Sequence, residues 1–139
     1  MGRVLVIDDE PDVLLLCRVN LRFAGHVVLE AQDGEHGIAD AVAERPDAIV
    51  LDLMLPNLDG YEVLRVLRDD ERTRDLPVLI LTAKVQMEDH RRCLQLGADA
   101  FLTKPFSPEV LSDAVHDVLE LGEDERAARR EAALESLGD

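Results

Sequence analysis

The stretch Ile49-Val50-Leu51-Asp52-Leu53-Met54-Leu55-Pro56-Asn57-Leu58-Asp59-Gly60 begins as a short apolar run, which is typical of a strand buried on both faces. The run reaches one carboxylate, Asp52, and ends in the turn-forming pairs Pro56-Asn57 and Asp59-Gly60. Open α/β sheets bind ligands at the carboxyl ends of parallel strands, which is where Asp52 would lie. An Asp at this place also suits a simple turn, in which it accepts hydrogen bonds from its own loop. The residues at the other predicted strand ends are needed to choose between a ligand-binding site and a simple turn.

The residues around this stretch alternate between short apolar runs and amphipathic segments. Besides the strand before Asp52, we predict strands at 4–7, 27–31, 78–81 and 100–103, and helices at 11–24, 35–43, 61–68, 88–96 and from 108 onward. The buried stripe of the first helix is predicted to comprise Val13, Leu16, Cys17, Leu21 and Ala24. Five strands alternating with five helices indicate right-handed crossovers and a parallel sheet covered on both faces. We therefore predict a doubly wound, flavodoxin-like α/β fold with strand order 2-1-3-4-5.

We assign residues 1–121 to one domain and residues 122–139 to an acidic C-terminal tail. The tail has no proline and is rich in Glu, Arg and Ala. This composition predicts a solvated helix or a disordered segment, supported by pairs such as Glu125–Arg129.

Composition narrows the class of protein. A chain of 139 residues, 47% of them hydrophobic, is long enough for a single core. The net charge of -15 and the pI near 4.5 argue against direct contact with nucleic acid or with an anionic membrane. Cys17 and Cys93 lack CxxC spacing, and Arg3 leads straight into an apolar run too short for a signal peptide or a membrane span. We therefore expect a cytoplasmic protein.

Five polar side chains fall at the predicted strand ends: Asp8, Asp9, Asp52, Thr82 and Lys104. In the order 2-1-3-4-5 these ends converge on one crevice. Carboxylates held this close repel one another and need a cation, and oxygen ligands suit Mg²⁺ better than zinc or copper. Thr82 and Lys104 could complete a cradle for phosphoryl oxygens. Asp52 would then be the nucleophile that forms an aspartyl phosphate.

Each of these residues also has a plainer interpretation. Asp8 or Asp9 alone would suit a helix cap, Thr82 a strand-end hydroxyl and Lys104 a solvated surface lysine. The four histidines have no mutual spacing that suggests a site, and we expect all of them at the surface.

Two known classes of protein are alternative explanations for an Asp nucleophile or for this fold. A haloacid-dehalogenase-type phosphatase also uses an Asp nucleophile, but it has a DxDxT pattern, and here Met54 and Pro56 stand at its second and third positions. A flavin-binding module would need stacking aromatic residues, which this chain largely lacks, and hydroxyl-rich phosphate loops where it has Asp8-Asp9.

Taken together, the motifs resemble the receiver domain of two-component response regulators over about residues 2–121. The matching segments are Val4-Leu5-Val6-Ile7-Asp8-Asp9-Glu10, Asp52-Leu53-Met54-Leu55-Pro56 with Asp59-Gly60, Leu81-Thr82-Ala83, and Gly97-Ala98-Asp99-Ala100-Phe101-Leu102-Thr103-Lys104-Pro105-Phe106. They occur in the family's order and spacing.

The resemblance implies that Asp52 receives a phosphoryl group from a sensor histidine kinase or a phosphotransfer protein. It further implies that Asp9, Asp52 and the Met54 carbonyl ligate Mg²⁺, that Asp8 acts through water, and that Lys104 binds the phosphoryl group. Such a domain catalyses only its own phosphorylation and dephosphorylation.

The resemblance also implies a switch. Thr82 would move to bind the phosphoryl group and Phe101 would turn inward, changing the face of the fourth helix, fifth strand and fifth helix for an unknown output partner. Lys104-Pro105 resembles the family's cis peptide. Met54 and Lys84 stand where the family tunes the lifetime of the phosphate, so we expect slow decay unless both side chains simply face solvent.

Overall fold

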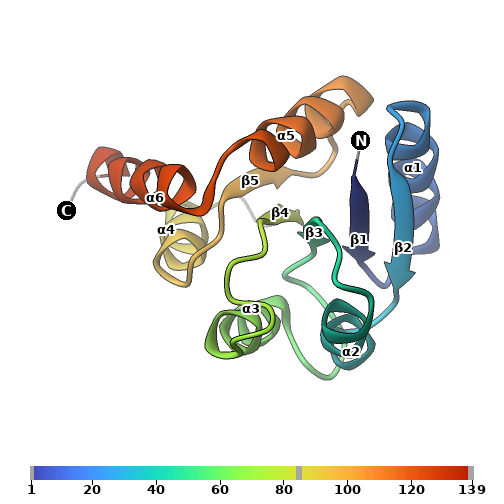
Figure 1. Cartoon of the computed structure of the whole chain (residues 1–139), viewed down its shortest axis with the longest axis horizontal. Coiled ribbons are helices and arrows are strands. Elements are labelled where there is room, and N and C mark those ends of the chain that lie inside the picture. The colour runs from blue at the N-terminus through green and yellow to red at the C-terminus, as the bar shows by residue number, and fades with distance from the viewer. Residues whose placement is uncertain (1, 84–85, 138–139) are drawn as a thin grey trace.

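The computed structural model of the chain describes residues 2–83 and 86–137. Its strands are β1 (Arg3–Ile7), β2 (Val27–Ala31), β3 (Ala48–Leu51), β4 (Val78–Thr82) and β5 (Ala100–Thr103). Its helices are α1 (Pro11–Phe23), α2 (Gly34–Glu44), α3 (Gly60–Asp69), α4 (Met87–Gln95), α5 (Pro108–Glu120) and α6 (Glu123–Leu137). The strands form one parallel sheet in the order β2-β1-β3-β4-β5, which confirms the predicted fold (Figure 1).

Helices cover both faces of the sheet. Figure 1 shows α1 and α5 on one face and α2, α3 and α4 on the other. Alternate residues of the central strands therefore enter two separate cores: Val4 and Val6 pack with α1 and α5, while Leu5 and Ile7 pack with the other three helices. Both faces of the central strands are apolar because both faces are buried.

The register of the sheet sets the place of the polar strand ends. Ile7 of β1 pairs with Leu51 of β3, so the next residues, Asp8 and Asp52, leave the sheet side by side. Thr82 of β4 pairs with Thr103 of β5, directly before Lys104.

The buried side of α1 differs from the predicted stripe. Leu14, Cys17 and Leu21 face the core, whereas Leu16 is 39% exposed and Ala24 is exposed. The apolar residues of α1 go almost all the way round the helix, so periodicity alone left the choice of face open. The prediction for Leu16 and Ala24 was wrong for that reason.

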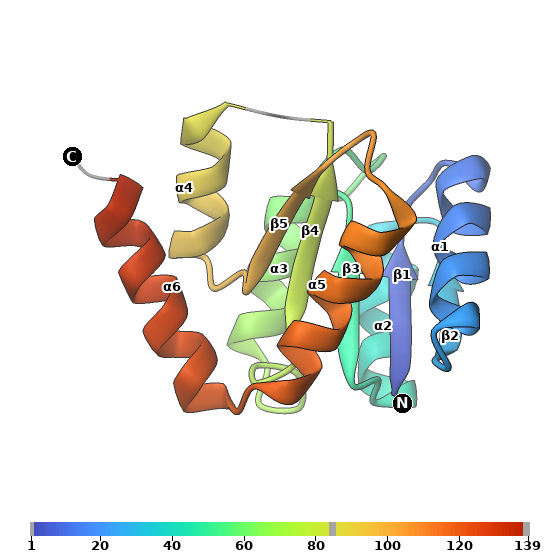
Figure 2. The same cartoon turned by 90° about the horizontal axis from the view of Figure 1, so that it is seen from above.

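The chain forms a sixth helix, α6, where we expected a solvated helix or a disordered tail. Figure 2 shows α6 alongside α4, at the β5 end of the sheet. Among the described residues of α6, Arg126 is buried, so this helix is partly packed rather than fully solvated. The division of the chain at residue 121 stays a prediction. Among all the helices that the structure describes, none has the length and apolar character needed to cross a bilayer.

Candidate functional site

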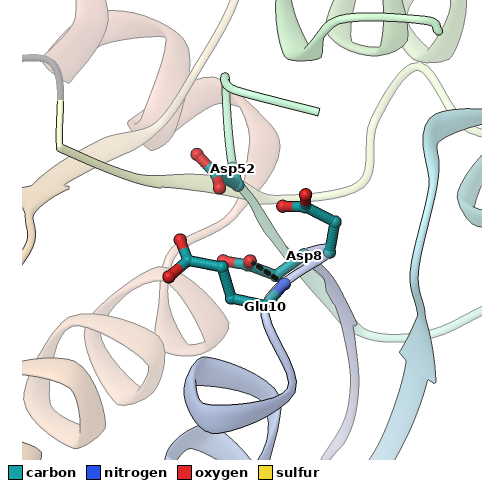
Figure 3. Close-up of side chains that lie close together, drawn as sticks. Asp8, Glu10 and Asp52 are labelled. Atoms are coloured by element: carbon teal, nitrogen blue, oxygen red, sulfur yellow. Dashed lines mark hydrogen bonds between the residues drawn. The ribbon is translucent and has the colours of Figure 1, made fainter. Parts of the chain in front are cut away.

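Two buried carboxylates lie at the carboxyl ends of the central strands. Asp8 is 1% exposed and Asp52 is 2% exposed. Figure 3 shows both of them, together with Glu10, grouped at the end of β1 and β3. Their placement follows from the parallel register, which brings the residues after Ile7 and Leu51 together.

Each buried carboxylate uses one oxygen to hold its own loop. Asp8 Oδ1 accepts a hydrogen bond from the Glu10 N–H at 2.9 Å, and Asp52 Oδ1 accepts one from the Met54 N–H at 3.0 Å. The second oxygen of each carboxylate faces Lys104. Asp52 therefore serves both as a turn residue and as part of a site, and the two interpretations of its position are compatible.

Lys104 is the cation at the centre of the group. Its Nζ lies 2.9 Å from Asp8 Oδ2, 2.9 Å from Glu10 Oε1 and 3.0 Å from Asp52 Oδ2. Burial lowers the pKa of the ammonium, but the hydrogen bonds to Glu10, Asp8 and Asp52 outweigh that effect and raise the pKa above its usual value. Burial raises the pKa of the Asp8 carboxyl, and the Glu10 N–H and Lys104 only partly offset it. Lys104 is thus held as a cation.

The carboxylates suit a divalent cation. One oxygen from each of Asp8, Asp9, Glu10 and Asp52 can be chosen so that all lie within 4.8 Å of one another. Among the described residues, Lys104 is the one ammonium paired with these carboxylates, so negative charge is in excess there. The all-oxygen donor set suits Mg²⁺. The residues present therefore fit the expected metal ion.

Glu10 joins this group although we did not select it from the sequence. It is the N-cap residue of α1, and its side chain makes no capping hydrogen bond, which leaves it free to reach Lys104. The only signal was its place as the third acid in the run Asp8-Asp9-Glu10.

Thr82 lies next to this centre, whereas Phe101 lies further inside the sheet, where it pairs with Ile80. Thr82 is fully buried, and its carbonyl accepts a hydrogen bond from the Lys104 N–H at 2.8 Å. Phe101 is partly buried, and its ring centroid lies 4.6 Å from that of His90 on α4. The Lys104–Pro105 peptide bond is cis.

The histidines differ from the expectation in one case. His26 is only 7% exposed, and its Nδ1 accepts a hydrogen bond from the Gly2 N–H at 3.0 Å. The expectation that all histidines are at the surface was therefore wrong for His26, because the start of the chain covers it.

Met54, one of the two residues expected to set the lifetime of the phosphate, lies at the mouth of the site. Met54 is 55% exposed and lines a pocket together with Asp9, Tyr61 and Arg92. The guanidinium carbon of Arg92 lies 3.9 Å from the centroid of the Tyr61 ring. Lys84 lies outside the described residues.

The chain is similar in sequence to a family of known proteins and to individual members of it. Residues 4–116 match the family of the response regulator receiver domain. The DNA-binding dual master transcriptional regulator RpaA of Synechocystis sp. is 49% identical over 119 residues, which are 86% of this chain and 49% of RpaA. Protein PilH of Pseudomonas aeruginosa is 37% identical over 119 residues, 86% of this chain and 98% of PilH.

A solved structure shows the same likeness. It is the receiver domain of the sensor histidine kinase PA1611 from Pseudomonas aeruginosa PAO1, with a magnesium ion coordinated in its active-site cleft. It is 32% identical, has a TM-score of 0.80, and the match covers 86% of this chain and 98% of that one.

One expectation is corrected by these relatives. We expected no direct contact with nucleic acid, on the strength of the net charge of -15. That expectation is contradicted by RpaA, which is a DNA-binding transcriptional regulator. The chain spans about half the length of this relative, 49%, so the net charge of these residues does not exclude contact with nucleic acid in this family.

Proposed function

Because the chain belongs to the response regulator receiver domain family of two-component signalling, we propose that Asp52 accepts a phosphoryl group. Members of this family are regulators rather than classical enzymes. The donor would be the phosphohistidine of a sensor kinase or of a phosphotransfer protein. We place this encounter in the cytoplasm.

The observation that carries the proposal is the pairing of Asp52 with Lys104. The carboxylate is 2% exposed, and its Oδ2 lies 3.0 Å from the lysine Nζ. A buried carboxylate beside a fixed cation is suited to attack phosphorus, because the cation can bind the phosphoryl oxygens as charge develops on them.

The transfer balances without a further reactant. A carboxylate oxygen of Asp52 forms a bond to phosphorus, and the bond between phosphorus and the donor's imidazole nitrogen breaks. The electron pair of that bond stays on the imidazole. Lys104 binds a phosphoryl oxygen throughout, and Thr82 moves to donate its hydroxyl to another.

Asp8, Asp9, Glu10 and Asp52, with the Met54 carbonyl, would hold Mg²⁺. When bound, the ion supplies positive charge that offsets the carboxylates and the phosphoryl oxygens. Glu10 was not among the metal ligands that the family resemblance implies, and we add it because it lies in the same group of carboxylates.

The test is labelling with acetyl phosphate and Mg²⁺, followed by intact mass spectrometry. Wild type should gain one phosphoryl group and Asp52→Asn none. Asp59→Asn is the matched control, because Asp59 is an exposed carboxylate that caps α3 and Asn can keep the cap. Stoichiometric labelling of Asp52→Asn would disprove the assignment.

Thr82 and Phe101 would transmit the effect of phosphorylation from Asp52 to the surface that binds the output partner. When Thr82 turns toward the phosphoryl group, Phe101 can move inward, which alters the α4–β5–α5 face. Lys104→Ala should leave metal binding largely intact but disconnect phosphorylation from this change. Nuclear magnetic resonance shifts on α4, with and without acetyl phosphate, would measure the difference.

The lifetime of the phosphate would depend on Met54 and Lys84. Met54 offers no hydrogen bond to a hydrolytic water, and a cation at position 84 could pair with the phosphoryl group in its ground state. We expect slow decay that accelerates in Met54→Asn/Lys84→Glu. Equal decay rates after removal of the donor would exclude this role.

A further inference from the structure

Charged contacts hold α6 against the rest of the fold. Asp99, whose side chain is 1% exposed, forms ion pairs with Arg68 of α3 and with Arg126 and Arg130 of α6. The pairs with Arg68 and Arg126 are both 3.0 Å long. Asp99 Oδ2 also accepts a hydrogen bond from the Val78 N–H at 2.9 Å. One buried carboxylate at the start of β5 thus ties α6 to the sheet.

A second contact lies at the other end of α6. Arg91 Nη2 of α4 donates to the Leu137 carbonyl at 3.3 Å. Figure 2 shows the two helices side by side. Arg126 and Arg130 are one turn apart, so both reach Asp99 from the same side of α6. α6 therefore lies along α4 as far as Arg91, which is in the middle of that helix.

Within residues 123–137, no apolar side chain of α6 is fully buried, although Ala127, Ala133, Leu134 and Leu137 are partly buried. Among the described residues of α6 only Arg126 is buried, at 5% exposed, and its Nε has no partner within the described structure. Burial lowers the pKa of Arg68, and the charges of Arg130 and Arg126 lower it further against the attraction of Asp99. Burying guanidinium groups offsets much, but not all, of what their ion pairs return. The net free energy of docking is therefore modest and depends on these pairs, so α6 can leave.

We propose that α4 and the Asp99 carboxylate form a docking surface for a helix with two arginines one turn apart, that α6 is its occupant in this chain, and that phosphorylation of Asp52 releases α6. Any partner that binds α4 must then displace α6. The release step rests on the proposed function, whereas the docking surface does not.

The route from the site to this surface runs through α4. α4 follows the end of β4, where Thr82 lies, and His90 of α4 stacks on Phe101 at 4.6 Å. A change at Thr82 and Phe101 therefore shifts α4. Because α6 is fixed to α4 through Arg91 and to the sheet through Asp99, a shift of α4 strains one attachment or the other.

Hydrogen–deuterium exchange of residues 123–137 tests the docking surface. Undocked, a helix of this length is marginal in water, so its amides should exchange about tenfold faster or more in Arg126→Ala/Arg130→Ala than in wild type. Arg129→Ala is the matched control, because Arg129 is on the same helix but is 55% exposed and pairs with Asp117 at the surface. It should exchange like wild type.

Asp99→Asn, which removes the charge but keeps an acceptor for Val78, should release α6 in the same way. Circular dichroism confirms that each variant is folded. Equal exchange of α6 in wild type, Arg126→Ala/Arg130→Ala and Asp99→Asn would overturn the docking surface.

The release step is tested with Mg²⁺ and beryllofluoride, a phosphoryl mimic. In wild type, exchange of α6 should accelerate by about fivefold or more on binding. By linkage, Arg126→Ala/Arg130→Ala should bind beryllofluoride more tightly by the same factor, and Arg129→Ala should not. If wild type does not bind beryllofluoride, the proposed function fails and the release step with it. If it binds and α6 exchange is unchanged, the release step alone is refuted.

Discussion

Gly60 sets how closely α3 approaches the loop that carries Asp52. A Cβ atom at this position would lie 2.4 Å from the Asp52 carbonyl oxygen and 2.5 Å from the Leu53 Cα. Both are backbone atoms, so relief requires the loop to move. We expect Gly60→Ala to lower the free energy of unfolding by about 1–3 kcal/mol and to slow the phosphorylation of Asp52. Urea denaturation and acetyl phosphate labelling measure the two effects.

Gly122→Ala is the matched control for Gly60→Ala. A Cβ atom at Gly122 would meet only Glu125 Oε1, at 3.6 Å, which is an ordinary contact. A loss of stability in Gly60→Ala no greater than in Gly122→Ala would contradict the close approach described for α3.

His26 should contribute to the pH dependence of stability. Its burial lowers its pKa, so the folded chain binds this proton less readily than the unfolded chain does. The free energy of unfolding should therefore fall as pH drops below about 6.5, the unperturbed histidine value, and through the lower folded pKa. In His26→Gln this part of the pH dependence should disappear.

The comparison isolates His26, because His116, which lines the same pocket, is present in both proteins. Thermal or urea unfolding measured in steps from about pH 7 to pH 5 supplies the data. Identical pH slopes in wild type and His26→Gln would show that the buried imidazole does not carry the effect.

Single residues differ in how far their sequence context reveals their role. Asp8, Asp52 and Lys104 could be selected from the sequence because each directly follows a strand, and parallel strand ends converge. Glu10 and His26 could not. The role of Glu10 depends on its ion pair with Lys104, which follows β5. The burial of His26 depends on its contact with Gly2. Both are tertiary contacts that the local sequence does not show.

At the scale of elements, α1 has two apolar faces with different tasks. Leu21 is fully buried, whereas Phe23 is 94% exposed. Leu21→Ala should cost about 2–5 kcal/mol in the free energy of unfolding because it leaves a cavity. Phe23→Ser should change it by no more than about 0.5 kcal/mol, as is usual for exposed positions. Chemical denaturation of the two variants decides whether α1 is oriented as described.

The elements also show why one helix was harder to predict than the others. The central strands and α3 have strong apolar patterns, and the structure has them within a few residues of their predicted bounds. α6 has a weaker apolar pattern, because its buried residue is Arg126 and its apolar residues, such as Leu134 and Leu137, are only partly buried. A search for apolar periodicity treats that arginine as solvated, so the ion pair with Asp99 is needed to explain why this side of α6 packs.

At the scale of the whole molecule, charge governs how the chain responds to cations. The net charge is -15, so any added salt will reduce repulsion across the surface. A response that is specific to the site must therefore be separated from general screening. A cation that binds the group of Asp8, Asp9, Glu10 and Asp52 can be distinguished from general screening, because one oxygen from each of these carboxylates lies within 4.8 Å of the others.

We expect Mg²⁺ to raise the stability of the whole domain, because a cation that binds only the folded state shifts the unfolding equilibrium. At a concentration of 100 times its dissociation constant the gain is about 2.7 kcal/mol. Asp9→Asn should lose most of this gain, while without Mg²⁺ it should be at least as stable as wild type, because one repulsive charge is gone. Wild type should be the more stable protein with Mg²⁺ present, and Asp9→Asn should be at least as stable once a chelator has removed the ion.

The measurement is urea denaturation at constant ionic strength, with NaCl replacing MgCl₂, so that general screening is equal in every sample. Asp113→Asn is the control, because Asp113 is an exposed carboxylate on α5, away from the group at the end of β1 and β3. It should keep the full response to Mg²⁺. If Asp9→Asn and Asp113→Asn respond alike, the stabilisation comes from the net charge of the chain, and the carboxylates beside Lys104 do not form the metal site.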